Sequence, residues 1–309
     1  MGATLPVYRR TAVAMDTLVT VDVVAAESAA VRAAVDRAFG WFGAAERQCS
    51  RFDPGSEVWQ LARRPGQPVP VSPLLYDVLQ FALAVAEASD GAFDPAIGAL
   101  LEARGFNRNY RTGQAVVSGI AATEPVSYRD IVLDPVRRTV RLRRPLLLEL
   151  GAVAKGLAVD LAARELAAFA NFAIDAGGDL YLAGRNASDE PWSVGIQHPR
   201  EPDALLTTLR VSDMAVCTSG DYLRRQPDRP GAHHLLDPRA REAAHAVASA
   251  TVVAPTALVA DALSTAAFVL GPEAGVQLFA AQGVAGLIVT PALTWQTTAD
   301  FSRFCEWPS

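Results

Sequence analysis

The stretch that decides the fold lies at residues 150–160 and reads LGAVAKGLAVD. An apolar run ends at Leu150, small residues follow, and a segment rich in Ala and Leu continues to Phe169. This pattern predicts a strand that ends, a tight turn and a helix over residues 152–169. Small side chains let a ligand approach the backbone closely, and the N-terminal end of a helix suits phosphate. An ordinary strand-to-helix turn has the same pattern, so both interpretations stay open at this point.

Lys155 is the one lysine in the chain, against 27 arginines among the 28 basic residues. At the start of the predicted helix, it would add a full positive charge to a phosphate site. The segment is not a Walker loop, because the second spaced glycine and the Ser or Thr after the lysine are missing.

Length and composition indicate an ordinary globular protein of 309 residues and 32.8 kDa, of which 50% are hydrophobic and 20% charged. The net charge of −5 argues against a general nucleic-acid binder, which usually carries a basic face. Arginines cluster only at residues 137–144, where alternation with apolar residues predicts a solvated hairpin. The three cysteines are odd in number and widely spaced, which fits neither a disulfide framework nor a zinc site.

The N-terminal residues carry no targeting signal that the sequence reveals. Residues 1–15 contain two arginines but no apolar core of signal-peptide length, and no cysteine precedes Cys49 to accept a lipid. We therefore expect a cytoplasmic protein with no signal peptide. Residues 252–271 are apolar enough to suggest a membrane span, but Pro255 and Asp261 interrupt them. Because an ionisable residue is costly in lipid, we expect a buried helix with a functional carboxylate and no transmembrane segment.

The rest of the chain mixes strands and helices without regular alternation, which predicts an α+β fold. No repeat, linker or clear domain boundary is visible. Helices are expected at residues 27–42, 74–88, 152–169 and 255–269. Strands are expected at residues 17–25, 172–174, 180–183, 192–196, 205–211, 215–217, 251–253 and 284–289, with a hairpin within 131–150 and a polar turn at 218–221.

A second candidate site lies within the predicted helix at 255–269. Asp261 and Thr265 are four residues apart and therefore share one helical face, with Ser264 beside them. A carboxylate, hydroxyls and a backbone carbonyl are hard oxygen ligands that suit Mg²⁺ bridging a pyrophosphate. A buried aspartate that caps a backbone group is the alternative.

The third candidate is His234, which precedes Asp237-Pro238 by three residues. The Asp-Pro pair forces a turn, and the histidine is positioned to act in the same pocket as a general base. The neighbouring His233 makes the choice between the two ambiguous, and a surface-loop histidine is the commoner interpretation of such a pair.

In this order the segments resemble the ApbE family, the FAD:protein FMN transferases, from Met15 to about Leu270. No single block carries the resemblance, but the ordered set is highly specific. The blocks lie at residues 15–17, 52–57, 91–95, 105–106, 154–160, 177–179, 218–221, 234–239 and 260–265.

The resemblance implies a single ApbE-like domain over residues 11–300, with mixed, largely antiparallel sheets, packed helices and an N-terminal extension at residues 1–10. It implies Mg²⁺-dependent transfer of the FMN moiety of FAD to a threonine hydroxyl of an acceptor flavoprotein, with release of AMP. Two alternatives stay open: an FAD pyrophosphatase that yields FMN and AMP, and a non-catalytic FAD-binding protein.

Matching positions carry the implied roles. His234 is the expected base and Asp261 the catalytic metal ligand, and Ala152 (through its backbone), Ser264 and Thr265 would complete the metal site. The expected FAD-binding residues are Met15, Phe52, Ala92, Phe93, Asp94, Glu149, Lys155 and Leu236. Three positions depart from the family pattern: Glu149 stands where Asp is usual, Ala152 where Gly is common, and Ala62 where Asn often occurs.

Overall fold

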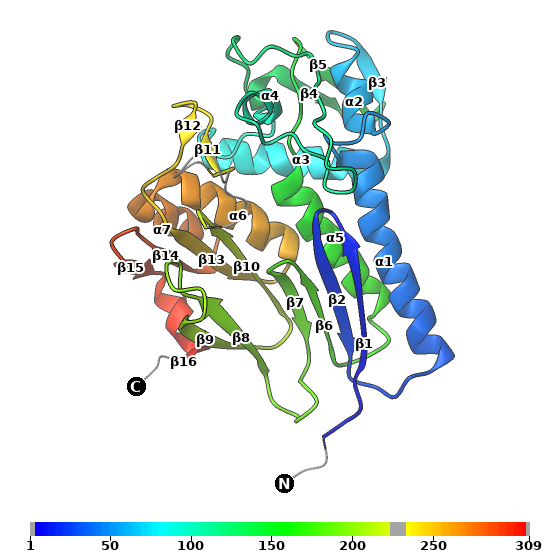
Figure 1. Ribbon diagram of the computed structural model, residues 1–309, viewed down its shortest axis with the longest axis vertical. Coiled ribbons are helices and arrows are strands. Elements are labelled where there is room, and N and C mark those ends of the chain that lie inside the picture. The colour runs from blue at the N-terminus through cyan, green and yellow to red at the C-terminus, as the bar shows by residue number, and fades with distance from the viewer. Residues whose placement is uncertain (1–3, 223–232, 307–309) are drawn as a thin grey trace.

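The computed structural model describes residues 4–222 and 233–306, and its centre is an eight-stranded sheet (Figure 1). All strand pairings in this sheet are antiparallel. In spatial order its strands are β1 (Tyr8–Ala14), β2 (Thr17–Val23), β6 (Phe172–Ala176), β7 (Asp179–Ala183), β10 (Met214–Gly220), β13 (Ser249–Ala254), β14 (Ala285–Val289) and β15 (Trp295–Thr297).

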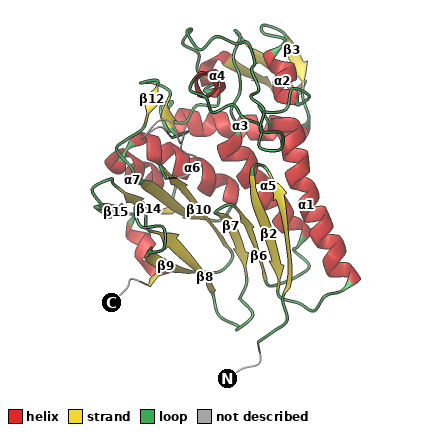
Figure 2. Cartoon of the chain, in the orientation of Figure 1, coloured by secondary structure: helices red, strands yellow, loops and turns green. Residues whose placement is uncertain are grey.

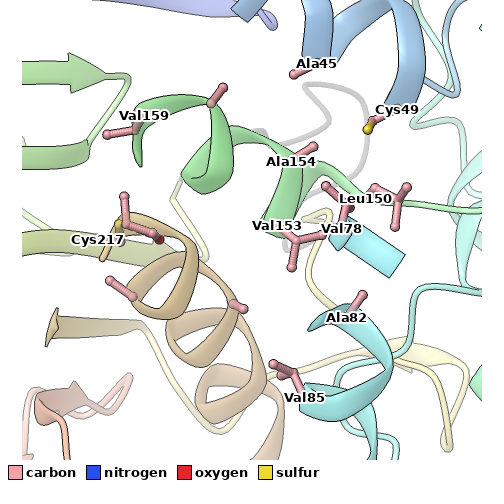
Figure 3. Close-up of a cluster of buried hydrophobic side chains, with 14 of the residues drawn as sticks. Ala45, Cys49, Val78, Ala82, Val85, Leu150, Val153, Ala154, Val159 and Cys217 are labelled. Carbon is pink, nitrogen blue, oxygen red and sulfur yellow. Dashed lines mark hydrogen bonds between the residues drawn. The ribbon is translucent and has the colours of Figure 1, made fainter. Parts of the chain in front are cut away.

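Four helices pack together over one face of this sheet: α1 (Ala29–Cys49), α5 (Gly151–Glu165), α6 (Ala257–Leu270) and α7 (Pro272–Ala281). Side chains of α5 lie between those of α1 and those of a further helix, α3 (Pro73–Ala88) (Figure 3). Small residues bring α5 and α6 close together. A Cβ added to Gly156 would lie 2.5 Å from the carbonyl oxygen of Ala257, so only glycine fits this helix contact.

The other face of the sheet is covered in part by a second, three-stranded sheet of β8 (Trp192–Gln197), β9 (Leu205–Val211) and β16 (Cys305–Glu306). Between the sheets lies a smaller apolar core that includes Val194, Leu209 and Val216. The 3₁₀ helix η2 (Ala299–Phe304) closes this core with Phe301, whose side chain is fully buried.

Residues 50–150 form a lobe that is inserted between α1 and α5 and lies at one end of the sheet (Figure 2). The chain enters the lobe along α1 and returns along α5. Besides α3, the lobe contains α2 (Glu57–Ala62), β3 (Pro68–Pro70), α4 (Gly98–Ala103), the 3₁₀ helix η1 (Tyr128–Asp130), β4 (Ile131–Asp134) and β5 (Thr139–Leu142). The short hairpin of β11 (Leu236–Asp237) and β12 (Glu242–Ala243) lies beside it.

The structure confirms the predicted α+β fold class. The predicted hairpin around Arg137 is formed by β4 and β5, with its arginines exposed. The helix predicted at 74–88 begins at Pro73, and the side chain of Ser72 caps it by accepting a hydrogen bond from the Leu75 N–H (3.2 Å).

Several predicted boundaries were wrong. Helix α1 continues to Cys49 rather than ending at residue 42, because apolar residues at helical spacing continue past its two glycines. The polar turn predicted at 218–221 is largely strand, since β10 pairs with β13 as far as Gly220. Helix α5 ends at Glu165 rather than residue 169, and α6 begins after Thr256, which caps it.

The strand predicted to end at Leu150 does not form. Residues 146–150 run as a largely buried, irregular segment whose backbone bonds to the loop before α4 and to the start of α4 instead of to a strand. The Glu149 N–H donates to the Pro95 carbonyl (2.8 Å), and the Gly98 N–H donates to the Leu147 carbonyl (3.0 Å).

Strand β1 begins at Tyr8, three residues before the predicted domain start at residue 11; residues 1–3 of the predicted extension lie outside the described residues. Within the described ranges, no helix is both long and apolar enough to cross a membrane. Cys49, Cys217 and Cys305 are all free thiols, and burial raises the pKa of Cys49 to about 12.

Candidate functional site

A large cleft of about 1100 Å³ opens where the lobe meets the layer of sheet and helices. Its walls come from the end of α1, lobe loops, the first turns of α5, the end of β10, and α6. Every residue assigned a role from the sequence lines this cleft except Ser264. The lining residues are Met15, Phe52, Ala92, Phe93, Asp94, Glu149, Ala152, Lys155, His234, Leu236, Asp261 and Thr265.

Helix α6 is fixed at its start by the neighbouring helix α5. The buried carboxylate of Asp160 accepts hydrogen bonds from the N–H groups of Ala257 (2.8 Å) and Leu258 (3.0 Å). A carboxylate suits this place because the first N–H groups of a helix have no intrahelical partner and carry a positive dipole end. Asp160 thereby sets the position of α6 relative to α5.

The cleft-facing side of α6 presents oxygen atoms from the predicted metal site. Asp261 is only 6% exposed, and Thr265 follows it by one turn. Ser264 is fully buried behind them, where its hydroxyl donates to the Asp261 carbonyl (2.9 Å). The Ser219 hydroxyl on β10 lies 2.9 Å from that of Ser264 and 3.1 Å from that of Thr265. Ser264 therefore supports the site from behind rather than facing the cleft.

Lys155 forms an ion pair that the sequence did not predict. Its ammonium contacts the carboxylate of Asp179 at the start of β7, and its Nζ lies 3.7 Å from Oδ2 of Asp261. All three side chains are largely buried, and that of Lys155, the most exposed of them, is 16% exposed. The ammonium thus lies between two carboxylates at the base of the cleft.

Glu149 connects the lobe to the first turn of α5. Its carboxylate accepts a hydrogen bond from the Gly151 N–H (2.7 Å) and forms an ion pair with the buried Arg51. The Arg51 guanidinium also donates to the Phe106 carbonyl (2.6 Å) and stacks on the ring of Phe52, 4.0 Å from its centroid. This group of contacts fixes one wall of the cleft.

The loop that follows α3 carries another buried carboxylate. Asp94 accepts hydrogen bonds from the N–H groups of Ala96 (2.8 Å) and Tyr128 (3.0 Å). Burial outweighs these hydrogen bonds and raises the pKa of Asp94 to about 6. The loop begins at Asp90 and Gly91, which both adopt positive φ and turn the chain sharply.

His234 and Met15 both line the cleft, from segments far apart in the sequence. His234 lies two residues before β11, whereas its neighbour His233 is buried and packs edge-on against Phe268 at 5.8 Å between ring centroids. The sequence left the two histidines ambiguous, and only His234 lines the cleft. Met15 and Asp16 form the β1–β2 turn. Their φ values of 50° and 63° are both positive, as in the two-residue turns that commonly connect the strands of a hairpin.

Sequence reasoning missed several polar cleft residues, notably Arg51, Asp179, Ser219 and Arg104. Asp179 and Ser219 fall in two of the blocks that carry the resemblance, at residues 177–179 and 218–221, but no site role was predicted for either; Arg51 adjoins the predicted Phe52. The side chain of Arg104 donates to the Arg241 carbonyl, which ties α4 to the β11–β12 hairpin. This contact joins residues that are 137 positions apart in the sequence, so it leaves no local pattern.

Comparisons with known proteins agree with the resemblance. The sequence model of the ApbE family matches residues 15–288. The FAD:protein FMN transferase of Treponema pallidum is 34% identical over 314 residues, which cover 92% of this chain and 84% of that protein. The FAD:protein FMN transferase of Escherichia coli K12 is 29% identical over 233 residues, which cover 72% of this chain. The match spans 66% of the E. coli protein, just under two thirds of its length.

A solved structure has the same fold. The crystal structure of the ApbE protein from Thermotoga maritima superimposes with a TM-score of 0.87 at 31% sequence identity. The match covers 97% of this chain and 100% of that one, so the lobe and the sheet layer are both shared.

Proposed function

Because the chain belongs to the ApbE family, we propose that it transfers the FMN moiety of FAD to a threonine hydroxyl of an acceptor flavoprotein and releases AMP. The names of the relatives support the transfer of FMN from FAD to a protein. The threonine, the metal and the roles of individual residues are our proposals from the cleft.

The observation that carries the proposal is the convergence of Asp261, Thr265 and Lys155 at the base of one large cleft. A carboxylate and hydroxyl on one helical turn, next to an ammonium, form a place for a metal-bound diphosphate. The cleft volume of about 1100 Å³ is large enough for a dinucleotide.

The donor set fits Mg²⁺. No group of three or more His, Cys, Asp or Glu side chains within residues 4–222 and 233–306 could hold a metal by itself. Magnesium, however, usually binds proteins through one or two carboxylates and completes its shell with water and substrate phosphates. Asp261, Thr265 and the backbone of Ala152 would hold the ion, with Ser264 supporting them. When bound, Mg²⁺ would neutralise the diphosphate and stabilise the charge on the departing phosphate.

We assign the FAD contacts to the other predicted cleft residues. Phe52 and Phe93 offer aromatic surface, Glu149 and Asp94 offer carboxyl groups, and Lys155 offers positive charge. Met15, Ala92 and Leu236 complete the lining.

The reaction exchanges one phosphorus–oxygen bond for another. The threonine oxygen attacks the phosphorus of the FMN half and the bond from that phosphorus to the bridging oxygen breaks, so AMP leaves with that oxygen. His234 accepts the proton of the threonine hydroxyl, and Lys155 offsets the negative charge of the phosphates.

The test incubates the protein with FAD, Mg²⁺ and an acceptor flavoprotein that has an exposed threonine motif, and measures AMP release and acceptor mass. We expect the acceptor to gain one FMN per AMP released. His234→Ala should lower the rate on the order of 100-fold or more, the usual contribution of a general base. His198→Ala serves as a matched control, because this histidine does not line the cleft.

The two alternatives give different results in the same assay. An FAD pyrophosphatase would release AMP and free FMN equally well without the acceptor. A non-catalytic FAD-binding protein would retain FAD without releasing AMP, and Asp261→Ala would change nothing in turnover. Either result would contradict the proposed transfer.

A further inference from the structure

The ion pair between Lys155 and Asp179 raises a question about the proposed metal site. The Lys155 ammonium contacts Asp179 and lies 3.7 Å from Oδ2 of Asp261, the carboxylate that we assign to Mg²⁺. A monovalent cation of this chain therefore lies next to the place where a divalent cation would bind. Something must prevent the ammonium from occupying the metal-binding carboxylate.

The backbone of Asp179 is held in place by a tight turn and by strand pairing. It begins β7 immediately after Gly177 and Gly178, whose φ values of 65° and 93° form the tight turn from β6. A Cβ added to Gly177 would lie 2.0 Å from Oγ1 of Thr17, so the turn is packed against β2. Asp179 also pairs with Cys217 of the central strand β10. Its backbone is thus fixed by the sheet, whereas Lys155 reaches its carboxylate on a long, flexible side chain.

We propose that Asp179 is a positioning residue that retains the Lys155 ammonium, so that Asp261 stays available to Mg²⁺. This inference rests on the proposed function and deepens it. A buried ammonium that loses its partner pairs with the next carboxylate, because an unpaired buried charge is costly. In this cleft the next carboxylate is Asp261.

Charge balance acts in the same direction. With Asp179 and Asp261 ionised, the three groups carry a net charge of −1, which favours a divalent cation. Without the carboxylate of Asp179 the remaining pair is neutral, and the attraction for Mg²⁺ falls. The three side chains are largely buried, so water screens this effect less than it would at the surface.

The experiment measures binding of Mn²⁺, as a probe for Mg²⁺, by electron paramagnetic resonance on the full chain without FAD. Asp179→Asn should weaken Mn²⁺ binding about tenfold, which corresponds to about 1.4 kcal/mol. In the transfer assay the same variant should need about tenfold more Mg²⁺ for half-maximal rate. Circular dichroism confirms that the variant is folded.

Two further variants separate positioning from a merely structural role. Adding Lys155→Met to Asp179→Asn removes the competing ammonium and should restore Mn²⁺ affinity. Asp175→Asn is the matched control: it removes an equal charge from the same turn, where an exposed carboxylate accepts a hydrogen bond from the Gly178 N–H (2.9 Å). This control should bind Mn²⁺ like the wild type.

The outcomes distinguish this inference from the proposed function. If Asp179→Asn binds Mn²⁺ as tightly as the wild type, or if Lys155→Met fails to restore binding, Asp179 does not position Lys155 in this way, and the transfer proposal stands. A wild-type protein that binds no Mn²⁺ would contradict both this inference and the proposed metal site.

Discussion

At the scale of single residues, Glu149 illustrates how one methylene group changes a wall of the cleft. The family pattern has Asp at this position, and the longer side chain here reaches both Arg51 and the Gly151 N–H. A Cβ on Gly151 would lie 2.8 Å from the Glu149 carboxylate, so the glycine and the glutamate fit each other. The departure therefore has a structural partner, whereas nothing in the structure explains Ala62, which is buried in α2.

The proposed role of the Lys155 ammonium can be tested by substitution. Lys155→Arg keeps the positive charge but replaces the compact ammonium between Asp179 and Asp261 with a larger, planar fork. We expect FAD affinity to fall on the order of tenfold in a fluorescence titration. Lys155→Met, which removes the charge, should weaken binding further. Equal affinity of the wild type and Lys155→Arg would show that the cleft does not need an ammonium.

Asp94 gives a prediction about pH. Its folded-state pKa of about 6 lies above the ordinary value of 3.8, so the folded protein binds this proton more tightly than the unfolded chain. Its contribution to the free energy of unfolding is thus fully present below pH 4 and is lost as the pH rises through about 6. The loss should be about 3 kcal/mol, because each pKa unit corresponds to about 1.4 kcal/mol.

Urea unfolding between pH 4 and pH 7.5 tests this expectation. The free energy of unfolding of the wild type minus that of Asp94→Asn should decrease over this range. The difference should level off above the folded-state pKa of Asp94. The control Glu27→Gln changes an exposed carboxylate and should follow the wild type. Parallel curves for the wild type and Asp94→Asn would mean that Asp94 does not titrate differently in the folded state.

At the scale of elements, the crossing of α5 and α6 determines the geometry of the site. Asp160 holds the first N–H groups of α6, and Gly156 lets the two helices approach at Ala257. The same pair of helices carries Lys155 and Asp261. The stretch at residues 150–160 therefore acts mainly by positioning a helix that lies a hundred residues later in the sequence.

Asp160→Asn tests this role. The amide has one accepting oxygen, so one of the two α6 N–H groups faces an NH₂ group and loses its bond. Leaving a buried donor unsatisfied costs about 1–3 kcal/mol, and the free energy of unfolding should fall by that amount in urea denaturation. The exposed ion pair between Arg32 and Glu27 offers a contrast, since Glu27→Gln should change stability by less than about 0.5 kcal/mol. A similar small effect for Asp160→Asn would show that α6 needs no cap from α5.

At the scale of the whole molecule, the cleft depends on two parts that fold from interleaved segments. The lobe of residues 50–150 supplies Phe52, Asp94 and Glu149 among others, and the layer of sheet and helices supplies Lys155 and Asp261 among others. A ligand in this cleft contacts both parts and should stabilise them together.

We expect FAD at 100 times its dissociation constant to stabilise the folded protein by about 2.7 kcal/mol, which raises Tm on the order of 5 °C. Differential scanning fluorimetry on protein with FAD and Mg²⁺ measures this shift. AMP, which fills part of the cleft, should give a smaller one at the same concentration. An unchanged Tm at saturating FAD would argue that FAD does not bind the folded protein.

The sequence predicted those parts of the fold that have a local period. Helix α3 and strand β9 follow directly from apolar spacing. Strand β1, α2, α4 and α7 were not predicted, and the buried segment before α5 looked like a strand because Leu146 to Leu148 are apolar. Its backbone partners lie in the loop before α4, which no periodicity reveals.

The residues of the candidate site also divide into those with a local sequence pattern and those without one. Asp261 and Thr265 are visible in the sequence because one helical turn separates them, and motif order pointed to His234 and Lys155. The partners across the cleft were not visible: Arg51 and Glu149 are 98 residues apart, and Asp179 meets Lys155 only through the turn between β6 and β7. Long-range charge pairs depend on the fold as a whole.

The enclosure of Lys155 also has a practical consequence for labelling chemistry. Apart from the amine at the start of the chain, this protein offers acylating reagents a single primary amine, and its side chain is 16% exposed in the cleft. Mass spectrometry of the acylated peptide would therefore report occupancy of the cleft directly, without a mutation or an attached dye. Any compound that fills the base of the cleft should protect that one amine, so the native chain can serve as its own screening reagent.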